Sequence, residues 1–535
     1  MSIPVLLRCA LLVVAAPVAT ILASPQTTPP HMEHTAPFLG RTLTIRIEGA
    51  PPLSAIDLFM SPEAGSFSTP YGVFELRREL ATRLASGVTT AAGTWSFDLP
   101  VPLDEALAEA GAHFQALVDD PSAPAGKILS DAVHARFLGP RVYAGFRGNA
   151  SPARAGLDIV SATTDAVVAR VEYGFTTEGR GSRHEGKPVF DAAYSRGAVM
   201  SQRRELLFFD PFFGGVQGRI AFPTDCSRTL LTDLGRRTVY VLELGGPSAA
   251  RVHAIDLATG SETAYLDLPN AVEPIWCAGR ASSEAFIAEY EPGGRTALRW
   301  IDLDPLSDHG SAAVGKPGSN AFTHYDGFRV EPLPMFYAAG QVFVSTTGPF
   351  TTSLQGNLTR CRAGPTGIAT RAMNLGFSRM YLMSAIPAAD RVLAAGLRTD
   401  FGPAGGLYEL PITTIGPPTG VPGHPQGGVF AHEIEPDGKI AWIIGEWEWD
   451  HADILYRLDL ETGAWTQTPH FWIFGHNDAE VLRDALNHEV WVSNTGFGPP
   501  INIDPEILVL DELHGTTRRI ALDRTVEVLH AVPLP

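Results

Sequence analysis

The sequence has few cysteines, and their spacing disfavours a thiolate metal site. Four occur in 535 residues, and no Cys-x-x-Cys pair is present. Three of them, Cys226, Cys277 and Cys361, lie beyond the apolar N-terminal run. An odd number cannot pair completely within one chain. Cys226 and Cys277 occupy matching places in successive repeats, and the sequence leaves open whether they form a disulfide or stay as buried thiols.

Long apolar runs are absent except at the start of the chain. Residues 9–23 are apolar or small, they follow Arg8, and Pro17 interrupts them. The run is too short to span a bilayer, and its order of charge, apolar stretch and small residue is typical of a secretion signal. We therefore predict a signal peptide over residues 1–24, a Pro- and Thr-rich linker over residues 25–40, and a secreted or periplasmic mature protein without a transmembrane segment.

Positive charge is scarce relative to negative charge. Lys and Arg together number 40 against 58 Asp and Glu, which gives a net charge of -18. A surface of this sign repels phosphate backbones, so nucleic acid is not expected as a partner. The partner classes that stay open are another protein and a small ligand.

Motifs that commit a chain to one reaction are also missing. The Gly-x-Ser-x-Gly hydrolase elbow does not occur, and neither HEIEP (432–436) nor HEVWV (488–492) carries a second His four residues after the first, as zinc proteases require. The sequence therefore supplies no catalytic residue and leaves open whether the protein is an enzyme. The absence of catalytic motifs from the sequence favours a binding module.

Helical patterns are rare, and β patterns fill residues 41–140. Leu43, Ile45 and Ile47 alternate with polar residues, which predicts a half-buried strand. Several such runs joined by short links predict an N-terminal β-sandwich over residues 41–140. The segment LRRELATRLA (76–85) is the one good helical candidate.

One segment of this region carries a resemblance. Residues 113–137, HFQALVDDPSAPAGKILSDAVHARF, contain an aromatic-x-Gln run, an Asp-Pro turn and a Ser-Asp-Ala run. They resemble the end of a small β-sandwich module of exported bacterial proteins. The resemblance implies an extracytoplasmic accessory domain and no activity of its own.

A repeat of strand, turn and strand occupies the rest of the chain. Its turns often have the form Asp-x-x-Thr-Gly, in which Asp caps the turn and Gly adopts the left-handed conformation. A spacing of about 50 residues matches a four-stranded propeller blade. The copies lie at 252–268, 297–305, 357–373, 405–412, 454–467 and 506–522, with two earlier hairpins at 157–173 and 206–222.

These repeats predict an all-β protein with a β-propeller over residues 155–535. No amphipathic helix of ten or more residues follows residue 140, which argues against a parallel α/β fold. Seven blades are favoured and six or eight stay open, with the two chain ends closing the ring. The layout resembles the YVTN-type β-propeller superfamily, a likeness that implies the fold and no particular function.

Polar residues of the C-terminal blades form the candidate site. They precede or open presumed inner strands, which line the central channel of a propeller, where imidazole and carboxylate groups bind divalent cations or polar ligands. The alternative is that each is a solvated strand-end residue. The predicted metal ligands are His432, His476 and Asp478, and the predicted ligand-binding residues are His424, Glu435 and Glu480.

Two tryptophans next to this cluster offer a second surface. Period-two alternation places Trp447 and Trp449 on one face of an extended segment. We predict either an aromatic face buried between blades or an edge that stacks on a sugar or peptide. Two hypotheses follow for the whole chain: a ligand- or protein-binding module, and a metal-dependent, lactonase-like propeller hydrolase whose only cofactor would be a divalent cation.

Overall fold

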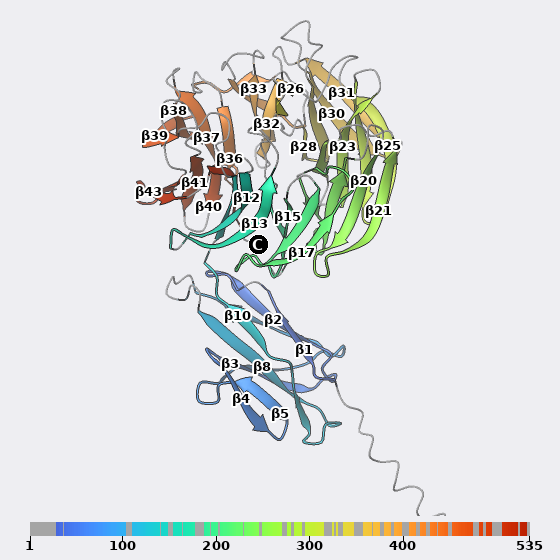
Figure 1. The fold of residues 1–535 in the computed structure, drawn as a ribbon, viewed down its shortest axis with the longest axis vertical. Coiled ribbons are helices and arrows are strands. Elements are labelled where there is room, and N and C mark those ends of the chain that lie inside the picture. The colour runs from blue at the N-terminus through green and yellow to red at the C-terminus, as the bar shows by residue number, and fades with distance from the viewer. Residues whose placement is uncertain are drawn as a thin grey trace, which may run out of the picture. The chain divides into compact units, whose positions relative to one another are not determined.

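The computed structural model divides the chain into two compact units, Met1–Pro140 and Arg141–Pro535 (Figure 1). The signal-peptide prediction for residues 1–24 lies outside the described residues. The structure describes residues 28–531 except 36, 103–106, 108–109, 140, 148–152, 163, 177–186, 193, 202–203, 228, 245–248, 270–274, 280–282, 292–294, 315–323, 326–327, 330–334, 347–356, 366, 375–378, 387–389, 398–405, 414–417, 424–428, 436, 448–451, 474–480, 485–487, 495–505 and 523–524.

The first unit consists of two sheets that share one hydrophobic core. One sheet has the order β1-β2-β7, the other has the order β10-β8-β3-β6 with β9 beside β8, and β4 and β5 form a separate hairpin. Side chains from both sheets, such as Ile45 and Phe114, are fully buried in the same cluster, as the packing of a β-sandwich requires. The strands are β1 (His31–His34), β2 (Thr42–Glu48), β3 (Ala55–Ser61), β4 (Ala64–Thr69), β5 (Gly72–Leu76), β6 (Thr82–Val88), β7 (Trp95–Pro100), β8 (Gly111–Asp119), β9 (Lys127–Leu129) and β10 (Val133–Arg136).

Two local predictions in this unit differ from the structure. The helix predicted over 76–85 is wrong, because Leu76 ends β5, a turn follows, and residues 82–85 belong to β6, which pairs with β3. Hydrogen bonding to the neighbouring strand thus outweighs the helical propensity of the segment. The predicted linker also contains structure, since β1 pairs with β2 and Met32 is buried.

The second unit is a β-propeller of eight four-stranded antiparallel sheets, counted over its described residues (Figure 1). Four sheets come first along the chain: β11 (Arg141–Arg147), β12 (Ala153–Ser161) and β13 (Ala166–Thr176) with β44 (Thr525–Ala531); β14 (Val189–Phe190), β15 (Gly197–Ser201), β16 (Glu205–Phe209) and β17 (Val216–Ala221); β18 (Leu231–Thr232), β19 (Thr238–Glu243), β20 (Ala249–Asp256) and β21 (Ser261–Pro269); β22 (Ile275–Ala278), β23 (Glu284–Glu291), β24 (Arg295–Leu303) and β25 (Leu306–Val314).

The remaining four sheets follow after a short hairpin of β26 (His324–Tyr325) and β27 (Phe328–Arg329). They are β28 (Met335–Ala338), β29 (Gln341–Thr346), β30 (Asn357–Gly364) and β31 (Gly367–Asn374); β32 (Arg379–Ile386), β33 (Arg391–Leu397), β34 (Gly406–Pro411) and β35 (Thr419–Gly420); β36 (Val429–Ile434), β37 (Ile440–Trp447), β38 (Ala452–Asp459) and β39 (Trp465–Ile473); β40 (Val481–Asp484), β41 (Glu489–Asn494), β42 (Glu506–Asp511) and β43 (Thr516–Ala521).

Each of the eight predicted copies falls in the outer half of one sheet, and those at 297–305 and 405–412 cover one strand each, so the fold class predicted from the repeats is confirmed. Eight is one of the three blade counts left open, and it is one more than the favoured count. The unit also begins at Arg141, before the predicted start at 155, because β11 and β12 belong to the first sheet.

The two ends of the second unit close the ring. Strand β44 pairs antiparallel with β11, so the C-terminal strand supplies the inner strand of the first sheet. Val142 of that sheet shares a buried cluster with Trp491 and Ile507 of the last sheet. Closure of this kind leaves no open sheet edge between the first and last blades, as predicted.

The Asp-x-x-Thr-Gly turns are built as predicted. Asp256 Oδ1 accepts hydrogen bonds from the backbone N–H and the hydroxyl of Thr259, at 2.6 and 2.7 Å, and the hydroxyl and N–H of Thr259 together lower the pKa of this carboxyl. Gly260 follows with a φ of 68°, a left-handed conformation that suits glycine. Asp459 and Gly463 repeat the arrangement in a later sheet.

The second residue of these turns, and of the related turn at 210–214, also joins neighbouring sheets. Its backbone carbonyl accepts a hydrogen bond from a side chain of the preceding sheet, which fixes the spacing of successive blades. The pairs are Tyr143 Oη to Pro211 O at 3.0 Å, Arg196 Nη1 to Leu257 O at 3.1 Å and Arg391 Nη2 to Leu460 O at 3.0 Å.

The three cysteines of the propeller are free thiols. Of the two states that the sequence left open for Cys226 and Cys277, the structure contains unpaired thiols. Cys226 and Cys361 are buried in different clusters, and burial raises the pKa of Cys361 to about 12. Thiols held in this protonated state are poor nucleophiles and metal ligands.

Candidate functional site on the inner strands

The first strands of successive sheets form the inner layer of the propeller. Strands β32, β36, β40 and β44 each contact the next, whereas β39 and β43 lie at the periphery (Figure 1). Side chains on this inner layer come from residues far apart in sequence. A site there needs groups from at least two blades, and one such contact is present between β32 and β36.

This contact joins His432 of β36 to Ser384 of β32. The ring Nε2 of His432 lies 2.8 Å from the Ser384 hydroxyl oxygen, a hydrogen-bonding distance. Both residues are half-buried. The other ring nitrogen, Nδ1, is out of contact with solvent and has no hydrogen-bond partner among the described residues. A buried polar atom in this state calls for a further hydrogen-bond partner.

The electrostatics of His432 keep its ring neutral at physiological pH. Burial lowers the pKa of His432 to about 4 because an imidazolium ion would lose its hydration there. A neutral imidazole has one N–H donor and one lone-pair acceptor, and Ser384 engages only one of the two. The second nitrogen can therefore bind a cation, or it can donate to or accept from a polar ligand.

Glu435, predicted as a ligand-binding residue, is engaged in contacts between sheets. Its carboxylate lies 3.2 Å from Nε of Arg483, and it accepts a hydrogen bond from Trp442 Nε1 at 3.1 Å. Arg483 in turn lies 2.8 Å from Glu512. These contacts hold the sheet that begins with β36 against the sheet that begins with β40.

The other predicted site residues are not placed. His424, Trp449, His476, Asp478 and Glu480 lie outside the described residues, and Trp447 ends β37 without a described side chain. The described residues contain no group of three or more His, Cys, Asp or Glu side chains that could hold a metal ion. The convergence of His432, His476 and Asp478 on one cation therefore stays a prediction.

Ser384 is the residue of this site that sequence reasoning missed. It lies in an apolar run, RMYLMSAI, where a lone serine is easily taken for a strand-end residue. The signal that identifies it is positional: β32 and β36 are the inner strands of successive sheets, so their residues face one another. That relation becomes visible only when the blade boundaries are known.

Comparison with known proteins identifies no family. No protein-family model matches the chain, and no curated protein matches it, so the resemblance to the YVTN-type superfamily stays a prediction. Similar solved structures include apo AztD from Citrobacter koseri (11% identity, 74% of this chain, 98% of that chain, TM-score 0.46), the Dos1 propeller (11%, 64%, 86%, 0.43) and the propeller domain of the Trilobed protease from Pyrococcus furiosus (10%, 64%, 98%, 0.39). Likeness at this level says nothing about the site.

Proposed function

We propose that this chain is an exported propeller protein that acts as a ligand- or protein-binding module, with its site on β32 and β36. One observation carries the proposal: Nδ1 of His432 is buried and has no partner among the described residues. Leaving such an atom unsatisfied costs free energy, which a bound ligand would recover by completing the hydrogen bond.

The chemistry of the pair favours binding over acid–base catalysis. A general base works best when its pKa lies near the operating pH, and the pKa of His432, at about 4, is far below neutrality. The same shift suits recognition, because the ring keeps one fixed hydrogen-bonding pattern across the physiological range. The apolar run that follows Arg8 at the start of the chain supports export.

A second candidate is the metal-dependent, lactonase-like hydrolase. The observation that favours it is the neutral state of His432, since metals bind the deprotonated imidazole. His476 and Asp478 would supply the further ligands. In that scheme these residues would hold a divalent cation, which would supply Lewis-acid polarisation of a substrate carbonyl, and a carboxylate would direct a water molecule.

One preparation tests both candidates. The mature protein, purified from exporting cells, is analysed by native mass spectrometry and by elemental analysis, beside His432→Ala and a control, His309→Ala. His309 lies on an outer strand, 2.7 Å from Asp302, and is remote from the pair in its contacts.

The binding module predicts a non-covalent adduct in the wild type and the control, lost in His432→Ala, without stoichiometric metal. A stoichiometric divalent metal that disappears in His432→Ala, together with hydrolysis of a lactone substrate, would replace the binding module with the hydrolase. A protein with neither adduct nor metal contradicts both.

A further inference from the structure

The first unit contains a small cavity whose wall includes a buried carboxylate. Its volume is about 350 Å³, within the range of small-molecule sites. Three segments bring its lining together: the stretch before β1, the loop from β2 to β3, and the turn from β8 to β9. The lining residues are Thr28, Pro30, Gly49, Ala50, Pro51, Asp120, Ser122 and Ile128.

Asp120 is the one ionisable residue of this lining. It is only 4% exposed. Its Oδ1 accepts both the backbone N–H of Ser122, at 2.9 Å, and the Ser122 hydroxyl, at 2.6 Å. No described residue donates to Oδ2 or forms an ion pair with Asp120. The nearest cation in sequence, Lys127, is paired with Asp119 at 2.7 Å. A carboxylate that is nearly out of water and lacks a cation favours a positively charged ligand.

The loop that lines the cavity carries a second unusual feature. Leu53, two residues after Pro51, has a φ of 55° and is 71% exposed. A leucine in the left-handed region is strained, and its exposed side chain gains nothing from burial. Strain of this kind is kept where the loop shape serves a purpose other than stability.

We propose that this cavity binds a small aliphatic primary amine, with its ammonium group against Asp120. An ammonium group has three donors and no acceptor, which matches the open Oδ2 of Asp120 and the presence of two hydroxyl residues, Thr28 and Ser122, in the lining. The aliphatic part lies against the apolar side of the lining, formed by Pro30, Pro51 and Ile128. An anion would be repelled, and a neutral apolar ligand would leave the carboxylate unpaired.

The site is independent of His432, which belongs to the other unit. It also differs from a metal site, because Asp120 is a single carboxylate and no group of three or more metal-binding side chains occurs in the described part of the chain. A test of amine binding at Asp120 is therefore independent of any test of the function proposed for the propeller.

The test uses two probes of equal length and different charge, n-butylammonium and n-butanol, with the full mature chain. Methyl NMR follows the Ile128 δ-methyl resonance during titration with each probe. We expect a saturable shift with n-butylammonium and none with n-butanol. In Asp120→Asn, which keeps an oxygen to accept from Ser122, the affinity for n-butylammonium falls about tenfold or more, because a charge-assisted hydrogen bond is lost.

The matched control is Asp119→Asn, which neutralises the neighbouring carboxylate that pairs with Lys127. It should bind n-butylammonium as the wild type does. Equal shifts with the alcohol, no shift with either probe, or an unchanged affinity in Asp120→Asn would each overturn the proposal. The contrast between the two probes needs only the wild-type chain, so it tests amine binding even if a variant fails to fold.

Discussion

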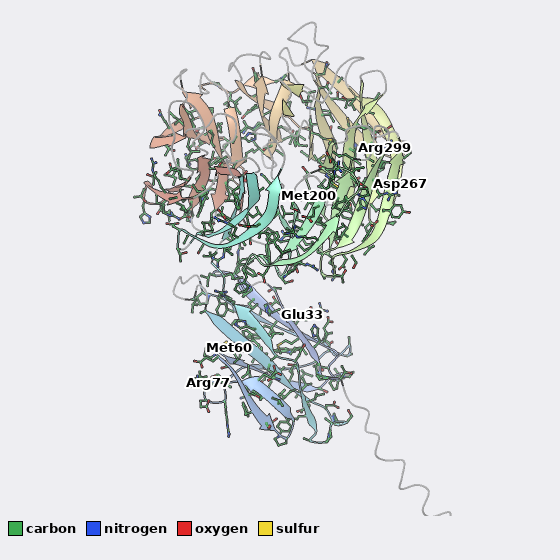
Figure 2. All side chains as sticks on the ribbon, in the orientation of Figure 1. Glu33, Met60, Arg77, Met200, Asp267 and Arg299 are labelled. Carbon is green, nitrogen blue, oxygen red and sulfur yellow. The ribbon has the colours of Figure 1, made fainter. Side chains whose placement is uncertain are left out.

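Replacing Arg299 with methionine should destabilise the propeller far more than replacing an exposed arginine would. The Arg299 side chain belongs to β24 (Figure 2). It is only 10% exposed. Its guanidinium donates two hydrogen bonds to Glu289, both at 3.1 Å, and one to Asp308 at 2.5 Å. A further bond at 3.3 Å reaches the Pro269 carbonyl of the preceding sheet. Removing the arginine would leave the 5%-exposed Glu289 carboxylate without its cation.

The expected cost of Arg299→Met is about 3–5 kcal/mol, the range for breaking a buried ion pair. The lower end is expected, since Asp308 is partly exposed and can be rehydrated. Urea unfolding at pH 7, followed by circular dichroism and tryptophan fluorescence, measures it. The control Arg251→Met removes a more exposed pair with Asp267 and should cost at most about 1 kcal/mol.

The loss should also depend on pH in a defined direction. Burial already raises the pKa of Glu289 despite the arginine, and without Arg299 the pKa should rise further. A carboxyl whose folded pKa is raised binds more protons in the folded state, so stability falls as pH rises above its unfolded pKa of 4.5. The deficit of Arg299→Met should therefore shrink between pH 7 and pH 5.

The double variant Arg299→Met/Glu289→Met removes both buried charges, and we expect it to recover at least half of the lost stability. The reasoning is refuted if the single variant costs less than about 1 kcal/mol at neutral pH, or if the double variant is as unstable as the single one.

Three further predictions address the turns, the site and export. Gly463→Ala should lower the free energy of unfolding by about 1–2 kcal/mol through backbone strain alone, because φ is 72° and the added methyl meets no atom within 4 Å. Gly463→Asn should cost less, and urea unfolding of the two variants measures the difference. The ring of His432 should stay neutral in NMR titrations down to about pH 5. Since its folded pKa is depressed, the stability it contributes is lost as pH falls from 6.5 through about 4. A titration midpoint of His432 near 6.5 would contradict its burial. N-terminal sequencing of the exported protein should begin at Pro25, and an intact Met1 would remove the export argument.

The propeller could be predicted because its repeat is local. A hairpin such as 252–268 contains its own turn chemistry, and Asp256 and Gly260 act within five residues of one another. The blade count could not be settled in the same way, because one sheet takes its inner strand from the far end of the chain. The helix predicted at 76–85 failed for a related reason: pairing with β3, more than twenty residues earlier, decides its structure.

The site was predictable only in part, because its contacts cross between blades. His432 could be identified as a polar residue on an inner strand, but its partner Ser384 lies 48 residues earlier, in the preceding sheet. Glu435 was equally suggestive in the sequence, yet Arg483, which is also 48 residues away, engages it in a contact between sheets. Spacing along the chain does not encode which side chains face one another across two sheets.

The central claim is that the second unit is one closed ring, and a cross-link between its ends tests it most directly. Ala144 of β11 lies opposite Leu529 of β44, whereas Thr525 lies opposite Arg147. Directly opposed residues have Cβ atoms about 4.5–5.5 Å apart, close enough for a disulfide after a small adjustment. The variant Ala144→Cys/Leu529→Cys should oxidise to an intramolecular disulfide between those two positions, detected by peptide mass mapping, while Ala144→Cys/Thr525→Cys should stay reduced. Cross-linking of neither pair, or of both equally, would contradict a ring closed by β11 and β44.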